Sequence, residues 1–453
     1  MQQILITGAN IVNEGRIFEG SVLIRGDRIE EVIPADSPTS LLEDLENIEL
    51  IDGRGKFLLP GVIDDQVHFR DPGLTNKGDL HTESRAAVAG GVTSFMDMPN
   101  TDPKATTLAI LEEKYKLASR KSLANFSFFL GATNENLEEI KKADPAKICG
   151  VKVFMGASTG NMLVDDPDVL EKIFSKSRMI IAIHSEDEGI IRENLAAFRE
   201  KYGEQIPMEA HPLIRSEEAC FVSTKRSVEL AAKHNTRLHV LHLSTARELE
   251  LFRNDIPLKK KRITAEVCVH HLWFDDRDYA RLGSRIKWNP AIKTEQDKEG
   301  LFKGLLEDKI DLIATDHAPH LEEEKSNPYL NCPSGGPLIQ HSLVIMMEFF
   351  HLKKISIEKI VEKMCHAPAV LYRIKDRGFI RKGCFADLVL VDTDDPWTVS
   401  KENILYKCGW SPFEGIKFSS RISHTFVNGN LVYRNGNFDE RFRGKRLEFN
   451  PEN

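Results

Sequence analysis

The sequence predicts an α/β fold: a (β/α)8 TIM-type barrel that carries a small β domain formed from both ends of the chain. Three observations support this prediction. Eight short apolar runs of strand length recur between residues 62 and 315, separated by longer amphipathic stretches, as expected for a parallel sheet with covering helices. Both flanks contain short strand patterns with glycine turns. The 453 residues are enough for a barrel with loop insertions and a second unit.

The barrel strands are expected where β-branched and aliphatic residues cluster. A doubly wound open sheet would show the same alternation, but no Gly-x-Gly-x-x-Gly turn follows the first strand, which favours the barrel. Helical patterns between the strands include residues 108–118 and 217–233. The eight expected strands are residues 62–69, 92–98, 126–130, 150–154, 179–184, 238–243, 262–267 and 311–315.

The flanking segments are expected to form one small β domain. Hairpin patterns occur in both, for example at residues 22–29 and 425–432. We therefore divide the chain into residues 1–56 as the first part of the β domain, residues 57–375 as the metal-dependent barrel, and residues 376–453 as the second part of the β domain with a C-terminal tail.

Composition and charge exclude several classes of protein. The chain is 41% hydrophobic and 29% charged, and its longest apolar runs fall far short of the roughly 20 residues of a membrane helix. A net charge of -8 gives no reason to expect nucleic-acid binding, so a small molecule is the expected partner. No secretory signal opens the sequence, which predicts a cytoplasmic protein. The seven cysteines form no Cys-x-x-Cys pair and are interpreted as reduced core thiols.

Polar residues that end four of the expected strands are the main candidates for chemistry. Reactive groups of a (β/α)8 barrel lie at the carboxyl ends of its strands. His68, His184, His242 and Asp316 end the first, fifth, sixth and eighth expected strands. Imidazole nitrogen and carboxylate oxygen bind zinc, and a catalytic zinc site keeps one position open for water. Because such an ion lowers the pKa of bound water to about 7, the pattern predicts metal-assisted hydrolysis.

Other residues near these strand ends allow two interpretations. Lys152, inside the fourth strand, either extends its charge to the barrel rim or takes part in the site. Arg70 is either an exposed loop charge or, because it follows His68 by two residues, directed at the same mouth. We interpret His270 and His271 as hydrogen-bonded structural residues.

Four motifs stand out: PGVID at residues 60–64, HFRDPG at 68–73, MPNT at 98–101 and DHAPH at 316–320. Together they resemble the dihydroorotases, within the amidohydrolase superfamily of cyclic amidases. The HFRDPG and DHAPH strings are specific, whereas PGVID is common across the superfamily. The resemblance covers nearly the whole chain. It implies the reversible interconversion of dihydroorotate and N-carbamoyl-L-aspartate in de novo pyrimidine biosynthesis.

The resemblance also implies roles for individual residues. His68 is expected to bind the more buried of two zinc ions, and His184 and His242 the more exposed one. Lys152 stands where many relatives carry a lysine that CO2 has carboxylated and that bridges two metals. Asp316 is expected to bind metal and to carry the proton from the attacking water to the departing ring nitrogen. The implied substrate-binding residues are Arg70, Asn100, Asn289, His320 and Gly335.

One position departs from the family pattern. The family's first strand carries His-x-His, whereas this chain has Gln66 before Val67 and His68. A neutral amide is a weaker zinc donor than imidazole, so the buried ion should bind less tightly or not at all. Either the enzyme works with a substituted two-metal site that includes Gln66, or it works chiefly through the more exposed ion with Gln66 as a hydrogen-bonding neighbour.

Two alternative functions stay open. A hydantoinase- or allantoinase-like cyclic amidase would share the barrel and the metals, but its substrates lack the ring carboxylate that Arg70 and Asn100 are expected to hold. An inactive homologue retained as a structural partner, for instance of aspartate transcarbamoylase, predicts erosion of the site, and only position 66 departs. A homodimer is a further expectation from the resemblance.

Overall fold

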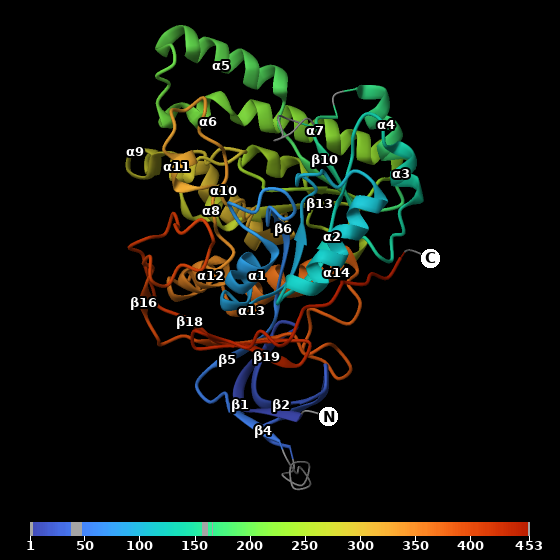
Figure 1. Cartoon of the computed structure of the whole chain (residues 1–453), viewed down its shortest axis with the longest axis vertical. Helices are drawn as coiled ribbons and strands as arrows, with labels where there is room; N and C mark the ends of the chain where they lie inside the picture. Colours follow the sequence, from blue (N-terminus) through green and yellow to red (C-terminus); the bar gives the residue numbers. More distant parts are fainter. Residues whose placement is uncertain (1–2, 38–47, 156–161, 165, 452–453) are drawn as a thin grey trace.

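Eight parallel strands form the barrel in the computed structural model, which describes residues 3–37, 48–155, 162–164 and 166–451 (Figure 1). The predicted (β/α)8 fold is confirmed. Strands β8 and β9 are two parts of the third predicted strand. The ring closes where Val67, at the end of β6, pairs in parallel with His317, just beyond β14. The strands are β6 (Val62–Val67), β7 (Val92–Asp97), β8 (Asn125–Phe128), β9 (Leu130–Gly131), β10 (Val151–Phe154), β11 (Ile181–His184), β12 (Leu238–Val240), β13 (Ile263–Cys268) and β14 (Leu312–Ala314).

Several strands end earlier than the apolar runs predict. Strand β6 stops at Val67 and β12 at Val240, although the apolar character continues for two or three residues. The chain turns out of the sheet at these points, and Arg70 and His242 have φ angles of 67° and 39°. The residues past each strand are therefore turned toward the barrel mouth.

Helices follow most strands and surround the barrel (Figure 1). Local signals set the ends of several helices: Asp79 and Thr82 form a capping box at the start of α1, and Asn235 ends α7 in the left-handed conformation. The helices are α1 (Leu80–Ala89), α2 (Leu108–Lys121), α3 (Leu137–Lys142), α4 (Pro167–Lys176), α5 (Glu188–Tyr202), α6 (His211–Ile214), α7 (Glu217–His234), α8 (Val269–Trp273), α9 (Tyr279–Leu282), α10 (Glu295–Leu306), α11 (Glu322–Lys325), α12 (Ser342–His351), α13 (Ile357–Val361) and α14 (Ala367–Tyr372).

A second sheet takes its strands from both ends of the chain. Among the described residues it has nine strands in the order β20-β19-β18-β15-β5-β1-β2-β3, with β4 also paired to β1. Strand β5 pairs with β1 on one side and β15 on the other, so the chain enters and leaves the barrel through neighbouring strands. Its strands are β1 (Gln3–Asn13), β2 (Arg16–Arg25), β3 (Arg28–Pro34), β4 (Glu49–Asp52), β5 (Phe57–Pro60), β15 (Leu388–Asp392), β18 (Arg421–Val427), β19 (Asn430–Arg434) and β20 (Asn437–Phe438). A separate pair of short strands, β16 (Trp397–Thr398) and β17 (Lys417–Phe418), lies outside this sheet.

The C-terminal tail returns to the barrel after β20. Arg446 pairs with Phe126 of β8, and Phe449 pairs with Ile374 beyond α14. A side chain at Gly444 would lie 1.9 Å from the carbonyl oxygen of Ala124, so only glycine permits this close approach. The tail is thereby fixed against the barrel wall.

Two expectations about the chain as a whole can be compared with the structure. No helix within the described residues has the length and apolar character to cross a bilayer. All seven cysteines are free thiols; five are buried, as predicted for core thiols, whereas Cys384 and Cys408 are only half-buried.

Candidate functional site

A cavity of about 120 Å³ opens at the carboxyl ends of the barrel strands. Every residue that the sequence analysis selected for the site lines this cavity, although the residues come from segments far apart in the chain. Phe154, Ala318, Pro333 and Ser334 complete the lining. The selected residues are Gln66, His68, Arg70, Asn100, Lys152, His184, His242, Asn289, Asp316, His320 and Gly335.

His184 and His242 are arranged as a metal-binding pair. Nδ1 of His184, the last residue of β11, lies 3.0 Å from Nε2 of His242. Two imidazole nitrogens bound to one tetrahedral zinc ion are about 3.3 Å apart, given Zn–N bonds of about 2.0–2.1 Å. Burial lowers the pKa of both imidazoles and so favours the neutral form that binds metals. A small opening of the pair would let both nitrogens bind one cation.

Glu186 orients the first of these histidines. Its Oε2 lies 2.8 Å from Nε2 of His184 and also accepts a hydrogen bond from Arg215. The carboxylate is fully buried, and Arg215 is nearly so. With Nε2 of His184 donating to Glu186, Nδ1 keeps its lone pair for the cavity, an arrangement common behind metal-binding histidines.

His68 and Asp316 meet on the opposite wall. Nε2 of His68 lies 3.1 Å from Oδ1 of Asp316, and Nδ1 of His68 lies 2.7 Å from Oδ1 of Asn100. Asn100, expected as a substrate contact, therefore also fixes the orientation of His68. Gln66 donates from Nε2 to the same Asp316 oxygen at 3.2 Å, while its Oε1 lies 3.8 Å from Sγ of Cys268.

Lys152 points into the cavity rather than out to the rim. The side chain is 1% exposed, which contradicts the interpretation that the ammonium extends to solvent. Burial lowers its pKa to about 7, against the attraction of Asp316 and Glu266. Its neighbour on one side is the ring of Phe154, whose centroid lies 4.7 Å from Nζ.

Arg70 is a buried cation, not an exposed loop charge. Its Nε donates to the carbonyl of Pro319 at 3.1 Å, and its Nη2 lies 3.2 Å from Nε2 of His320. Burial and the nearby guanidinium lower the pKa of His320 to about 3, so the imidazole is neutral and accepts from Arg70. No carboxylate of the described residues lies within ion-pair distance of Arg70, although Asp316, Asp97 and Glu324 attract it from further away.

Asn289 and Gly335 also line the cavity. Oδ1 of Asn289 is buried and has no hydrogen-bond partner among the described residues. Gly335 has a φ angle of 121°, and a Cβ there would lie 2.7 Å from the carbonyl oxygen of Ala318. Lys325 holds this segment in place by donating to the carbonyls of Pro333 and Gly335.

Three residues of the site have a strained backbone conformation. Arg70, His242 and Asp316 all have positive φ angles, which residues with a Cβ rarely adopt. Such residues persist where the surrounding structure holds them, and they are common at functional sites.

Sequence reasoning missed several residues that support the site. Glu186 directly follows a strand-end histidine, and Glu266, inside the apolar strand β13, accepts from the backbone nitrogen of His242 at 3.1 Å. A charged residue inside an apolar run was the available signal for Glu266. The interpretation of His270 as hydrogen-bonded is wrong: both ring nitrogens are buried without a partner among the described residues.

Comparisons with known proteins show similarity to one family over most of the chain. The model of the Amidohydrolase family matches residues 57–432. A dihydroorotase of Pyrococcus abyssi is 31% identical over 98% of this chain and 98% of its own length. A dihydroorotase of Carboxydothermus hydrogenoformans is 32% identical over 95% of this chain and 98% of its own.

Solved structures give the same fold. An L-hydantoinase (dihydropyrimidinase) from Arthrobacter aurescens superimposes with a TM-score of 0.91 at 27% identity, covering 99% of this chain and 100% of that one. A dihydropyrimidinase from Brevibacillus agri gives a TM-score of 0.85 at 23% identity over 96% of each chain, a likeness of fold alone.

Proposed function

We propose that this chain, which belongs to the amidohydrolase family, is a dihydroorotase that interconverts dihydroorotate and N-carbamoyl-L-aspartate in pyrimidine biosynthesis. The observation that carries the choice of substrate is Arg70. A buried guanidinium without a carboxylate partner is costly, and a substrate carboxylate at the cavity wall would supply that partner in bidentate geometry.

The donor set supports one firmly held metal ion. His184 and His242 present two neutral nitrogens at nearly the spacing of a zinc shell. A bound Zn²⁺ would polarise the substrate carbonyl and lower the pKa of water. We assign His184 and His242 to this ion, and His68, Lys152 and Asp316 to the remaining metal-binding positions. Carboxylation of Lys152 by CO2 would turn a buried amine into an anionic oxygen ligand.

Gln66 favours operation chiefly through the more exposed ion. Its amide nitrogen, not its oxygen, faces Asp316, so in this orientation it holds the carboxylate and offers no lone pair to an ion beside His68. We therefore assign Gln66 the role of a hydrogen-bonding neighbour.

Asp316 is the proposed acid and base. Its contacts with His68 and Gln66 both use Oδ1, so we assign the proton transfer to Oδ2. A carboxylate in this position takes the proton from water and returns it to the departing ring nitrogen. The unpaired Oδ1 of Asn289 is suited to accept from a ring N–H of the substrate.

The second candidate function is a hydantoinase-like cyclic amidase, which the likeness to the L-hydantoinase structure favours. Its substrates lack the carboxylate that Arg70 would bind. The two candidates are separated by measuring ring opening of dihydroorotate, hydantoin and dihydrouracil with the same preparation.

The test of the assignment is Arg70→Ala, with exposed Arg441→Ala as the control. Loss of a buried charge partner costs roughly 2–4 kcal/mol, so KM for dihydroorotate should rise roughly 30- to 1,000-fold. Any turnover of carboxylate-free rings should not show this rise. An unchanged KM for dihydroorotate, or faster native turnover of hydantoin, would overturn the proposal.

A native chain without any cyclic amidase activity would support the structural-partner alternative. Co-purification with aspartate transcarbamoylase is the direct test of that alternative. Size-exclusion chromatography tests the proposed homodimer.

A further inference from the structure

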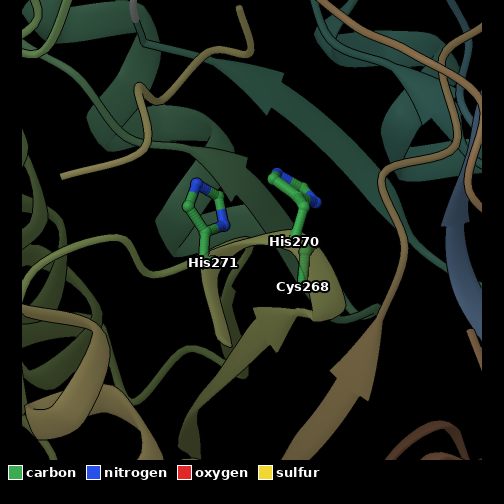
Figure 2. A group of neighbouring side chains, drawn as sticks. All are labelled: Cys268, His270 and His271. Atoms are coloured by element: carbon green, nitrogen blue, oxygen red, sulfur yellow. The ribbon is translucent and has the colours of Figure 1, made fainter. Parts of the chain in front are cut away.

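We propose that Cys268, His270 and His271 form a second metal site, distinct from the cavity set, that takes a zinc-class cation through one thiolate and two imidazoles. The three residues lie at the carboxyl end of β13 and in the first turn of α8. One ligand atom from each lies within 4.8 Å of the other two. Figure 2 shows the two imidazole rings side by side at the end of the strand, with Cys268 below His270.

Three of the four imidazole nitrogens of this cluster lack the partners that buried polar atoms normally have, among the residues that the structure describes. Nε2 of His271 lies 3.3 Å from the carbonyl of Pro290 and donates to it, which leaves Nδ1 as a lone-pair acceptor that is buried and unpartnered among the described residues. Both ring nitrogens of His270 are likewise buried. The carbonyl of Thr315 lies near this ring but outside hydrogen-bonding geometry.

Packing explains where the ring of His270 lies, but it does not explain why two polar nitrogens are buried there without hydrogen-bond partners among the described residues. The ring stacks on Trp288 at 4.5 Å with an interplanar angle of 24°, a contact that a phenylalanine could make. Each buried polar group left unpaired costs about 1–3 kcal/mol. A cation between the rings would use these lone pairs, while the carbonyl of Pro290 holds His271 from behind, as second-shell groups do at metal sites.

The donor set selects the kind of cation. One sulfur and two imidazole nitrogens suit zinc, and cobalt as its substitute, rather than calcium or magnesium, which prefer oxygen ligands. Ligand atoms of a closed tetrahedral zinc shell lie about 3.3–3.8 Å apart, so the side chains would close inward on binding. Cys268 would lose its thiol proton to solvent as the ion binds.

Gln66 lies between the two sites. Its Oε1 faces Sγ of Cys268 at 3.8 Å, whereas its Nε2 faces Asp316 in the catalytic cavity. The amide oxygen is therefore the nearest candidate for the fourth ligand of the new site. On this assignment, glutamine at position 66 replaces a histidine that would bind a metal in the cavity, and its amide oxygen instead binds the metal of the neighbouring thiolate site.

Cobalt spectroscopy tests the proposal independently of activity. The catalytic cavity contains no cysteine, so a near-ultraviolet thiolate-to-cobalt charge-transfer band in the Co²⁺-loaded chain can arise only outside it. We expect the native chain to show this band at saturation and Cys268→Ser to lose it while keeping the visible cobalt bands. The matched control is Cys220→Ser, which alters another buried thiol and should keep the band.

X-ray absorption of the zinc-loaded native chain gives the same answer without a variant, since a Zn–S distance of about 2.3 Å is distinct from Zn–N and Zn–O. Absence of sulfur scattering from a fully loaded chain, or a charge-transfer band that survives Cys268→Ser, would overturn the site. An active chain without the sulfur signal rejects this site alone, whereas a sulfur signal in an inactive chain rejects the dihydroorotase assignment alone.

Discussion

Replacing Glu186 by glutamine should weaken metal binding while leaving the shape of the site intact. One carboxylate oxygen, Oε2, receives both His184 and Arg215, and Oε1 is buried without a partner among the described residues. In Glu186→Gln the amide oxygen can still receive both groups. The substitution therefore removes the negative charge behind the imidazole and adds an unpaired buried amide nitrogen.

The expected magnitudes follow from this geometry. Loss of a second-shell carboxylate typically lowers metal affinity 10- to 100-fold, which is about 1.4–2.7 kcal/mol. Arg215 also loses its buried counter-ion, which costs about 3–5 kcal/mol of folding stability when no polar group replaces it. Because the amide keeps one hydrogen bond to Arg215, we expect a loss near the lower end of that range.

The double variant Glu186→Gln, Arg215→Met separates the two effects. Removing the uncompensated guanidinium should restore much of the stability, measured as the urea midpoint, but not the zinc affinity, measured by competition with a chelator. Two results would refute the reasoning: zinc affinity of Glu186→Gln within twofold of native, or full recovery of affinity in the double variant. Either would mean that Glu186 supports the fold and does not tune His184.

Three further changes test other parts of the site. Asp316→Asn removes the proposed proton carrier and should lower kcat about 10²- to 10⁴-fold with an unchanged circular dichroism spectrum; activity within tenfold of native contradicts that role. Gly335→Ala places a Cβ 2.7 Å from the Ala318 carbonyl oxygen at a φ of 121° and should cost about 1–3 kcal/mol and lower kcat/KM at least tenfold. The matched control for this is Gly436→Ala, where φ is 87° and nothing lies within 4 Å, and equal effects on kcat/KM would remove the steric explanation. Gln66→His should add one zinc ion per chain relative to native by elemental analysis, and an unchanged zinc content would mean that position 66 does not limit the buried metal.

The barrel and the main cavity residues could be predicted because their signals are local. Each barrel strand is a short apolar run bounded by turn or polar residues, and His68, His184, His242 and Asp316 each stand where such a run ends. In a parallel barrel all those ends lie on one face, so sequence order alone brings the side chains together.

The supporting contacts could not be predicted because they depend on partners far away in sequence. Arg215 reaches Glu186 across 29 residues with no spacing pattern to mark the pair. The orientation of Gln66 is decided by Asp316 and Cys268, each about 200 or more residues away. Whether His270 finds a hydrogen-bond partner is decided by the packing around it, which is why its sequence position suggested an ordinary structural histidine.

The sheet that joins both ends of the chain imposes a delay during protein synthesis. Strand β5 needs β15 beside it, and Leu388 pairs with Pro60, 328 positions earlier. At about 5–20 residues per second, roughly 15–65 s pass before the ribosome delivers the partner strand. Throughout that interval β5 presents an open edge of apolar residues, the kind of surface that promotes aggregation. A chaperone that covers the edge of β5 would protect the nascent chain during this delay.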